Sequence, residues 1–216
     1  MVNVVVIYGF PRSGKDTFVN FCKKMLGPFG HSISTVDFVK ELALQCGWDG
    51  TKTPESRKFL SDLKDLLSEW NDIPWKKVEE EYDYIKTECF QYGLKDSDFF
   101  LFIHSREPKE IERFKEEYGA VTVLVDRREV EGEQSNHSDA DVMDYTYDYI
   151  INNNSTLEDL QARAMTFIES VKFTNQHKTS ITPFEVEEMS ELYDIITNNR
   201  KDEDNEKYCR NCFSRP

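Results

Sequence analysis

The chain has 216 residues, of which 38% are hydrophobic and 31% are charged, and its formal net charge is −14. This length suits one α/β domain with a small addition. The acidic balance argues against nucleic acid as a partner, because phosphate contacts need a basic face. No apolar stretch approaches the roughly 20 residues of a membrane span, so no membrane partner is expected.

The first segment is predicted to be a strand, a loop and a helix. Residues 2–8 (VNVVVIY) are mostly β-branched and do not alternate strictly, which is typical of a strand buried on both faces of a parallel sheet. Gly9 ends this strand. From Gly14 the apolar residues recur every three or four positions, which predicts a helix as far as Gly27.

A second strand is predicted at residues 31–36, and three helices follow it. Asp37 begins a helix that ends at Gly47. Pro54 and Pro74 each occupy the first turn of a longer helix, a position that suits proline. The helix from Pro54 carries Leu60, Leu63, Leu67 and Trp70 on one face, and the helix from Pro74 carries Trp75, Val78, Tyr82, Ile85 and Cys89.

The later elements return to alternating strands and helices. Residues 99–103 (FFLFI) and 120–125 (AVTVLV) are apolar strands on either side of an amphipathic helix at 109–118. Residues 148–151 form a short final strand. This order predicts an α/β fold, a doubly wound parallel sheet with a helical insertion.

The C-terminal part is predicted to separate into a domain and a tail. Residues 127–146 are polar without periodicity, which indicates a lid or excursion. Ser155 and Glu158 form a capping box for the last helix of the domain. We therefore expect a domain at 1–172, followed at 173–216 by a linker, one helix and a charged segment.

The stretch GFPRSGKDT has most of a phosphate-binding loop, G-x-x-x-x-G-K-[ST], between a buried strand and a helix. Glycines let backbone N–H groups face phosphates, and the new helix adds its positive end. Lys15 is expected to reach the β- and γ-phosphates of ATP, and Thr17 is placed to donate to the α-phosphate. The predicted nucleotide-binding residues are Gly9, Arg12, Ser13, Gly14, Lys15, Asp16 and Thr17.

Asp16 occupies the position where the motif has Ser or Thr, whose hydroxyl would bind Mg²⁺. A carboxylate can coordinate Mg²⁺ itself or hold a metal-bound water, so Asp16 is the candidate metal ligand. The alternative is an acid that only interacts with the dipole at the start of the helix.

GFPRSGKDT resembles the G-x-x-R-S-G-K-D-T loop of phage-type deoxynucleoside monophosphate kinases and related P-loop kinases, in which Asp after Lys is usual. Several further segments match that family more loosely, and they occur in the same order as in the family. The resemblance covers about residues 1–172. The resemblance implies a P-loop kinase fold, ATP and Mg²⁺ as cofactors, and a nucleotide substrate. The matched substrate positions are Asp37 and Lys40 in VDFVKELA, Arg57 in SRKFLSDL, and Arg106 in SREPKEIERFKEEYGAVTVLVDR.

Two positions depart from the family pattern. The family commonly has an acidic pair at the end of its third strand, whereas this chain has His104 and Ser105, so the metal carboxylate expected there is missing. Ser61 occupies a position where the family has Gln, which leaves the base and the sugar of the acceptor open.

Several basic residues have alternative interpretations. Arg106 follows a buried strand, so it could bind phosphate or form an ion pair with Glu107 or Glu110. Arg57 could bind the acceptor or lie on the surface. The predicted catalytic residues are Lys15, Arg106 and the lid arginines Arg127 and Arg128, which kinases bring onto the transferring phosphoryl group, although the last two could instead form a charged rim.

The remaining histidines and cysteines carry weaker signals. His104 and His137 have no metal-ligand spacing. Cys209 and Cys212 form a lone C-x-x-C, whereas a structural zinc site needs four ligands. The five cysteines form no disulfide framework in a chain of this size, and the N-terminal apolar run is too short for a signal peptide, so a cytoplasmic protein is expected.

The sequence thus predicts an ATP-dependent phosphotransferase acting on a (deoxy)nucleoside monophosphate. Three alternatives stay open: a kinase for another acceptor such as phosphomevalonate or a sugar, a nucleotide-binding module without turnover, and an interaction protein that acts through its acidic tail. The expected partners are small nucleotides, and a homodimer is left open.

Overall fold

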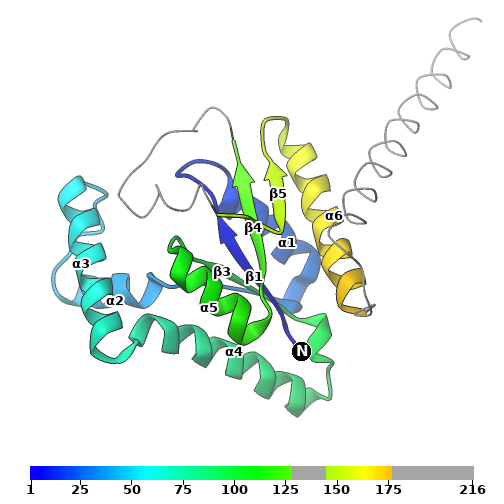
Figure 1. Ribbon diagram of the computed structural model, residues 1–216, viewed down its shortest axis with the longest axis horizontal. Coiled ribbons are helices and arrows are strands. Elements are labelled where there is room, and N and C mark those ends of the chain that lie inside the picture. The colour runs from blue at the N-terminus through cyan, green and yellow to red at the C-terminus, as the bar shows by residue number, and fades with distance from the viewer. Residues whose placement is uncertain (128–144, 177–216) are drawn as a thin grey trace, which may run out of the picture. The chain divides into compact units, whose positions relative to one another are not determined.

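The structure is a computed structural model that describes residues 1–127 and 145–176 (Figure 1). Its centre is a parallel sheet of five strands in the order β2-β3-β1-β4-β5. The predicted doubly wound parallel sheet is therefore confirmed. The strands are β1 (Asn3–Tyr8), β2 (Gly30–Ser34), β3 (Phe100–His104), β4 (Val121–Asp126) and β5 (Tyr149–Asn152).

Six α-helices and two short 3₁₀ segments accompany the strands in the described part of the chain, and α6 follows the last strand. Each predicted helix of residues 14–171 is present, with bounds that differ by a few residues. The helices are α1 (Lys15–Leu26), α2 (Asp37–Gln45), α3 (Pro54–Asn71), α4 (Ile73–Tyr92), α5 (Pro108–Tyr118) and α6 (Leu157–Gln176), with η1 (Gly27–Phe29) and η2 (Asp96–Asp98).

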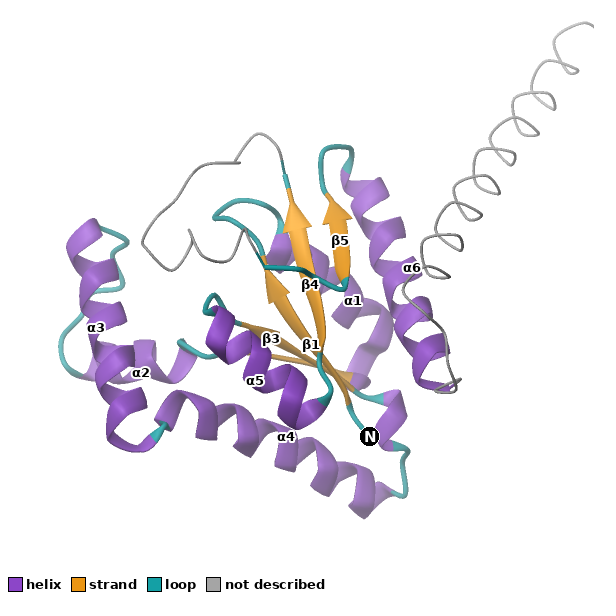
Figure 2. Ribbon diagram, in the orientation of Figure 1, coloured by secondary structure: helices purple, strands orange, loops and turns teal. Residues whose placement is uncertain are grey.

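Helices cover both faces of the sheet, which explains why its central strands are apolar along most of their length (Figure 2). The first core cluster packs α1 and α6 on one face, with Phe18 and Phe167 among its fully covered side chains. The second packs α4 and α5 on the other face, where Trp75 stacks on Phe114. β1 lies between β3 and β4, so the segment after it begins at the middle of the sheet.

α3 differs from its prediction. Leu60, Leu63 and Leu67 are only partly buried, and the side chain of Trp70 is 81% exposed. The four residues do share a face, but α3 packs on α2 and α4 to one side of the sheet rather than on the central core (Figure 1). Lys64 is the buried residue of this helix.

The start and end of α6 also differ from the prediction. The backbone N–H of Asp159 donates to Thr156 Oγ1 at 3.2 Å, and the N–H of Thr156 approaches Asp159 Oδ2 at 3.4 Å. The cap is therefore one residue later than the expected Ser155 and Glu158 pair. The helix continues to Gln176, so residues 173–176 are helical rather than part of a linker.

Residues 1–171 form one compact unit. The proposed domain boundary after residue 172 stays a prediction, and most of the expected lid and tail lie outside the described residues. Among the helices of the described part of the chain, none combines the length and apolar character that a bilayer crossing requires.

Candidate active site

The loop between β1 and α1 has a tightly curved backbone. Two of its residues have positive φ angles, Arg12 at 68° and Gly14 at 92°. The N–H of Ser13 donates to the carbonyl of Phe10 at 3.0 Å, which closes a turn before the helix starts at Lys15. Backbone N–H groups at such a helix start form an anion-binding site.

Neighbouring atoms fill the space beside both glycines of the loop. A Cβ on Gly9 would lie 2.4 Å from Ser13 Oγ and 2.8 Å from the carbonyl oxygen of Val125. A Cβ on Gly14 would lie 2.3 Å from Asn153 Nδ2. Close packing against the backbone of Val125 therefore requires glycine at position 9, and the positive φ favours glycine at position 14.

Asn153, which the sequence does not single out, forms a hydrogen bond with the loop although it lies 140 residues later in the chain. Its Nδ2 donates to the carbonyl of Ser13 at 2.7 Å, and its own N–H donates to the carbonyl of Asp126 at 2.7 Å. The signal that could have found it is its place directly after the last strand, inside the block YIINNNSTLEDL.

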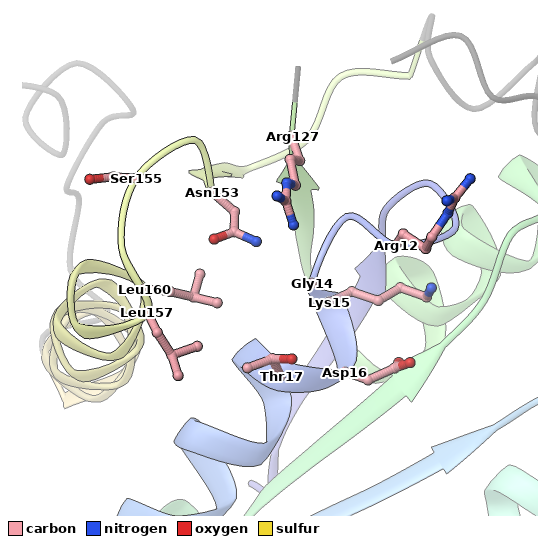
Figure 3. A pocket seen from close by; sticks show the side chains of 10 residues that line it. All are labelled: Arg12, Gly14, Lys15, Asp16, Thr17, Arg127, Asn153, Ser155, Leu157 and Leu160. Carbon is pink, nitrogen blue, oxygen red and sulfur yellow. The ribbon is translucent and has the colours of Figure 1, made fainter. Parts of the chain in front are cut away.

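Two cavities meet at the loop. The first has a volume of about 430 Å³, and Figure 3 shows Asn153 on one side of the loop, with Arg12, Lys15 and Asp16 extending on the other. The second cavity has a volume of about 1200 Å³. Arg12, Lys15 and Asp16 line both. The first is completed by Gly14, Thr17, Arg127, Asn153, Ser155, Leu157 and Leu160.

The larger cavity gathers every predicted substrate residue. Asp37, Lys40, Arg57 and Arg106 all line it, although they come from three separate segments of the chain. Asp37 Oδ2 accepts from the N–H of Ser34 at 2.9 Å, and Asp37 Oδ1 lies 3.1 Å from Lys40 Nζ. Asp37 therefore anchors the start of α2 and orients Lys40.

The carboxylates near Arg106 have a partner that the sequence does not predict. Glu107 and Glu110 both contact Lys64, at 2.6 Å and 2.7 Å. Arg106 itself is exposed, and with Lys64 and Glu107 it lines the larger cavity.

His104 ends β3 beside the loop, at the position where the resembled family has an acid. Its Nδ1 lies 3.6 Å from Asp16 Oδ1, and its side chain is mostly covered, whereas that of Asp16 is 77% exposed. Burial lowers the pKa of His104, and attraction to Asp16 acts in the opposite direction. The imidazole is therefore neutral at pH 7.

Asp16 is suited to Mg²⁺, which proteins commonly hold through one or two carboxylates together with substrate phosphates. Within residues 1–127 and 145–176 there is no group of three His, Cys, Asp or Glu side chains that could hold a metal ion.

Four predicted or discussed residues, Arg128, His137, Cys209 and Cys212, lie outside the described residues. Of the described cysteines, Cys22 and Cys89 are buried and Cys46 is exposed.

Comparisons with known proteins give little further information. No protein-family model matches the chain, and no curated protein matches it. Among solved structures, the chain is similar to a sugar kinase from Janibacter sp. with 16% identity and a TM-score of 0.39, over 79% of this chain and 98% of that one. A similarity at this level defines no activity.

Proposed function

We propose that this protein is a P-loop phosphotransferase that transfers the γ-phosphoryl group of ATP to a small phosphorylated acceptor. One observation carries the proposal: Lys15 and Asp16 line both cavities, at the point where they meet. A donor phosphate held by the loop would face an acceptor in the larger cavity. That arrangement suits direct transfer between two bound molecules.

The smaller cavity supports ATP as the donor. The start of α1 and the loop N–H groups suit its phosphates, and Thr17 and Arg127 add polar contacts at the wall. Leu157 and Leu160 supply an apolar surface on the side of α6, which suits a purine ring. These residues bind and orient the donor.

The larger cavity supports an anionic acceptor. Lys40, Lys52, Arg57 and Arg106 line it, which is a local excess of cations in a chain with a net charge of −14. Its volume exceeds the roughly 300–1,000 Å³ of common ligand sites, so a nucleotide fits. The resemblance of the loop and its flanking blocks makes a deoxynucleoside monophosphate our first candidate.

The reaction needs no covalent enzyme intermediate. An oxygen of the acceptor phosphate attacks the γ-phosphorus, and the bond to the β,γ-bridging oxygen breaks, so that ADP leaves with the electron pair. Mg²⁺, when bound, neutralises the donor phosphates. Lys15 contributes positive charge at the transferring group, while Arg57 and Arg106 hold the acceptor in line.

A second candidate function is nucleotide binding without turnover. His104 and Ser105 take the place of the acid that related kinases have at this strand end, which is the observation that favours it. If the acceptor were a sugar or phosphomevalonate, the proposed ATP site would be the same and only the acceptor would differ.

The proposal is tested by incubating the full chain with Mg·ATP and a panel of acceptors: ribo- and deoxynucleoside monophosphates, phosphomevalonate and sugars. We expect ADP and a phosphorylated product, identified by mass spectrometry, with at least one nucleoside monophosphate. Lys15→Ala is the negative control, and Lys24→Ala, an exposed lysine of the same helix, is the matched one. Binding of ATP without any product would identify a binding module, and absence of ATP binding would refute both.

A further inference from the structure

The buried residue of α3 is a lysine. All 18 residues of this helix are described, and of these only Lys64 is buried, with a side chain that is 7% exposed. Leu60 and Ser61 lie three and four positions after Arg57, and Lys64 lies three positions after Ser61. All four line the larger cavity. One polar face of α3 is thus turned toward the proposed acceptor.

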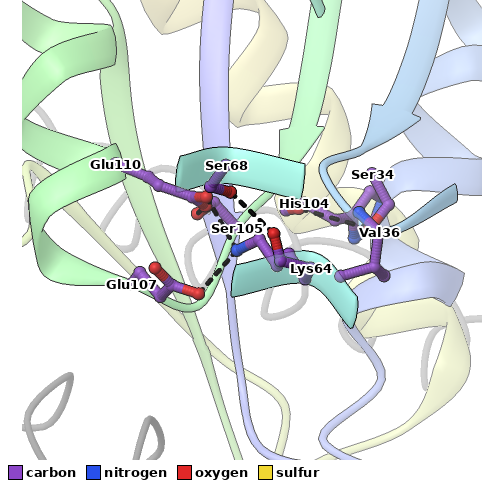
Figure 4. A network of polar contacts seen from close by, with 8 residues as sticks. All are labelled: Ser34, Val36, Lys64, Ser68, His104, Ser105, Glu107 and Glu110. Carbon is purple, nitrogen blue, oxygen red and sulfur yellow. Dashed lines mark hydrogen bonds and ion pairs between the residues drawn. The ribbon is translucent and has the colours of Figure 1, made fainter. Parts of the chain in front are cut away.

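Lys64 connects this helix to the segment that follows β3. Its Nζ lies 2.6 Å from Glu107 Oε1 and 2.7 Å from Glu110 Oε1, and Ser105 Oγ donates to Glu110 Oε2 at 2.5 Å (Figure 4). We call these four residues, Lys64, Ser105, Glu107 and Glu110, the Lys64 clasp.

The clasp is a salt bridge whose lysine side chain is buried. Burial acts to lower the pKa of Lys64, but attraction to Glu110 and Glu107 outweighs it, so the pKa lies above its usual value. Lys64 therefore stays protonated at neutral pH. Lys64 is the buried member of this contact, whereas the side chains of Glu107 and Glu110 are 38% and 19% exposed. Removing the ammonium leaves two partly covered carboxylates without their shared partner, which is destabilising.

α3 has fewer buried apolar side chains than the other long helices. α4 and α6 insert several fully covered apolar side chains between themselves and the sheet, whereas no apolar side chain of α3 is buried. Instead, α3 contributes partly buried leucines and the ion pair of Lys64 with Glu107 and Glu110.

The residues of the clasp also lie next to the two arginines of the proposed acceptor site, either in sequence or on the same helix face. Ser105 and Glu107 are the chain neighbours of Arg106, and Lys64 is two helical turns from Arg57 on the same face. We propose that Lys64 is a positioning residue, which holds α3 against the β3–α5 segment so that Arg57 and Arg106 approach the acceptor from fixed positions. The acceptor part of this inference rests on the proposed function.

The structural part is tested without any ligand, by hydrogen exchange of the full chain. Lys64→Met removes the charge and keeps the length of the side chain. Lys58→Met is the matched control, since Lys58 lies on the same helix and pairs with Asp62 in solvent. We expect the amides of α3 to exchange at least tenfold faster in Lys64→Met, with α1 and α6 unchanged. Equal exchange of α3 in both variants would overturn the clasp.

The functional part is tested by kinetics with the nucleoside monophosphate that the panel identifies. Lys64→Met should raise KM for this acceptor at least tenfold, with a smaller change in kcat and an unchanged Kd for ATP. Lys64→Arg, which can contact both carboxylates, should restore most of the acceptor affinity. Faster exchange of α3 with an unchanged acceptor KM would overturn the positioning role.

A triple variant separates positioning from folding. Lys64→Met combined with Glu107→Gln and Glu110→Gln leaves no uncompensated carboxylate, so it should fold even if Lys64→Met does not. We expect it to keep the fast exchange and the raised KM, and parent-like values of both would overturn the inference. If the parent phosphorylates no acceptor, the proposed function fails and the acceptor role falls with it, while the exchange experiment still decides whether the clasp holds α3.

Discussion

Asp16 Oδ1 lies 3.6 Å from His104 Nδ1, so the first turn of α1 and the end of β3 meet in the wall of the larger cavity. In the resembled kinases a strand-end acid stands near this point. Here a carboxylate comes from the first turn of α1 instead, and the strand contributes an imidazole whose pKa is lowered by burial. Our proposal therefore assigns the metal to Asp16.

Asp16→Asn should weaken the Mg²⁺ dependence of activity strongly. The change keeps the size of the side chain and removes its charge, and the loss of one preorganised electrostatic group costs about 2–4 kcal/mol of transition-state stabilisation. An acid that only complements the helix dipole would cost about 0.3–1 kcal/mol of stability and leave turnover nearly unchanged. Titrating Mg²⁺ against activity in the variant and the parent measures this, and coincident curves would show that the metal is held elsewhere.

Lys15→Ala should lower kcat roughly 10²–10³-fold, the usual effect of losing one group that stabilises transition-state charge. The side chain is partly exposed at the meeting point of the cavities, so the free energy of unfolding should change by only about 0.5 kcal/mol. Turnover and urea unfolding are measured beside Lys24→Ala. An active Lys15→Ala protein would contradict the loop assignment.

Asn153→Ala should weaken ATP binding without affecting the acceptor. It removes the 2.7 Å hydrogen bond to the carbonyl of Ser13, which contributes about 0.5–1.5 kcal/mol and orders the loop. Asn154→Ala is the control, because that side chain bonds to Asn152 within its own turn. Calorimetric titration with ATP should show a severalfold higher Kd for Asn153→Ala only, and equal values would rule out this role of Asn153.

The Lys64 clasp should lose its stabilising effect at high pH. Because the pKa of Lys64 is raised on folding, its contribution is complete below its unfolded pKa of about 10.5 and falls as the pH rises through the folded value. The difference in unfolding free energy between the parent and Lys64→Met, measured with urea from about pH 9 to about pH 11, should therefore shrink. A difference that stays constant over this range would contradict the pairing.

Truncation after Gln176 should leave a cooperatively folding protein. The residues of α6 that belong to the core extend only to Val171, and the cut preserves the helix as described. Truncation after residue 172 removes four helical residues and should be slightly less stable. Urea unfolding followed by circular dichroism compares the two with the full chain. An insoluble or non-cooperative product would show that residues 177–216 are needed for folding.

Local patterns are sufficient to predict the sheet and the loop. A strand buried on both faces has a composition of its own, and the spacing of Gly9, Gly14 and Lys15 follows from what a phosphate requires of the backbone. Periodicity also identifies the face of α4 that carries Trp75 and Ile85. It cannot say what will cover such a face, which is why the same reasoning places the exposed Trp70 on a packed face.

Contacts between distant segments are beyond prediction. Lys64 and Glu107 are 43 residues apart, and Asn153 and Ser13 are 140 residues apart, so neither pair leaves a local pattern. The helix cap is displaced for a different reason. Ser155-x-x-Glu158 and Thr156-x-x-Asp159 overlap and both fit the pattern of a capping box, and the fold selects the second.

The central place of β1 has a consequence for synthesis on the ribosome. The first residue of this strand pairs with Phe100 and its third with Val121, so β1 has no neighbour in the sheet until about a hundred further residues have been made. At ~5–20 residues per second this takes on the order of 5–20 s. During that interval NVVVIY is an uncharged, β-prone hexapeptide of the kind that aggregates. The strand that precedes Gly9 is therefore an aggregation-prone segment that has no partner in the sheet for much of the time in which the chain is unfinished.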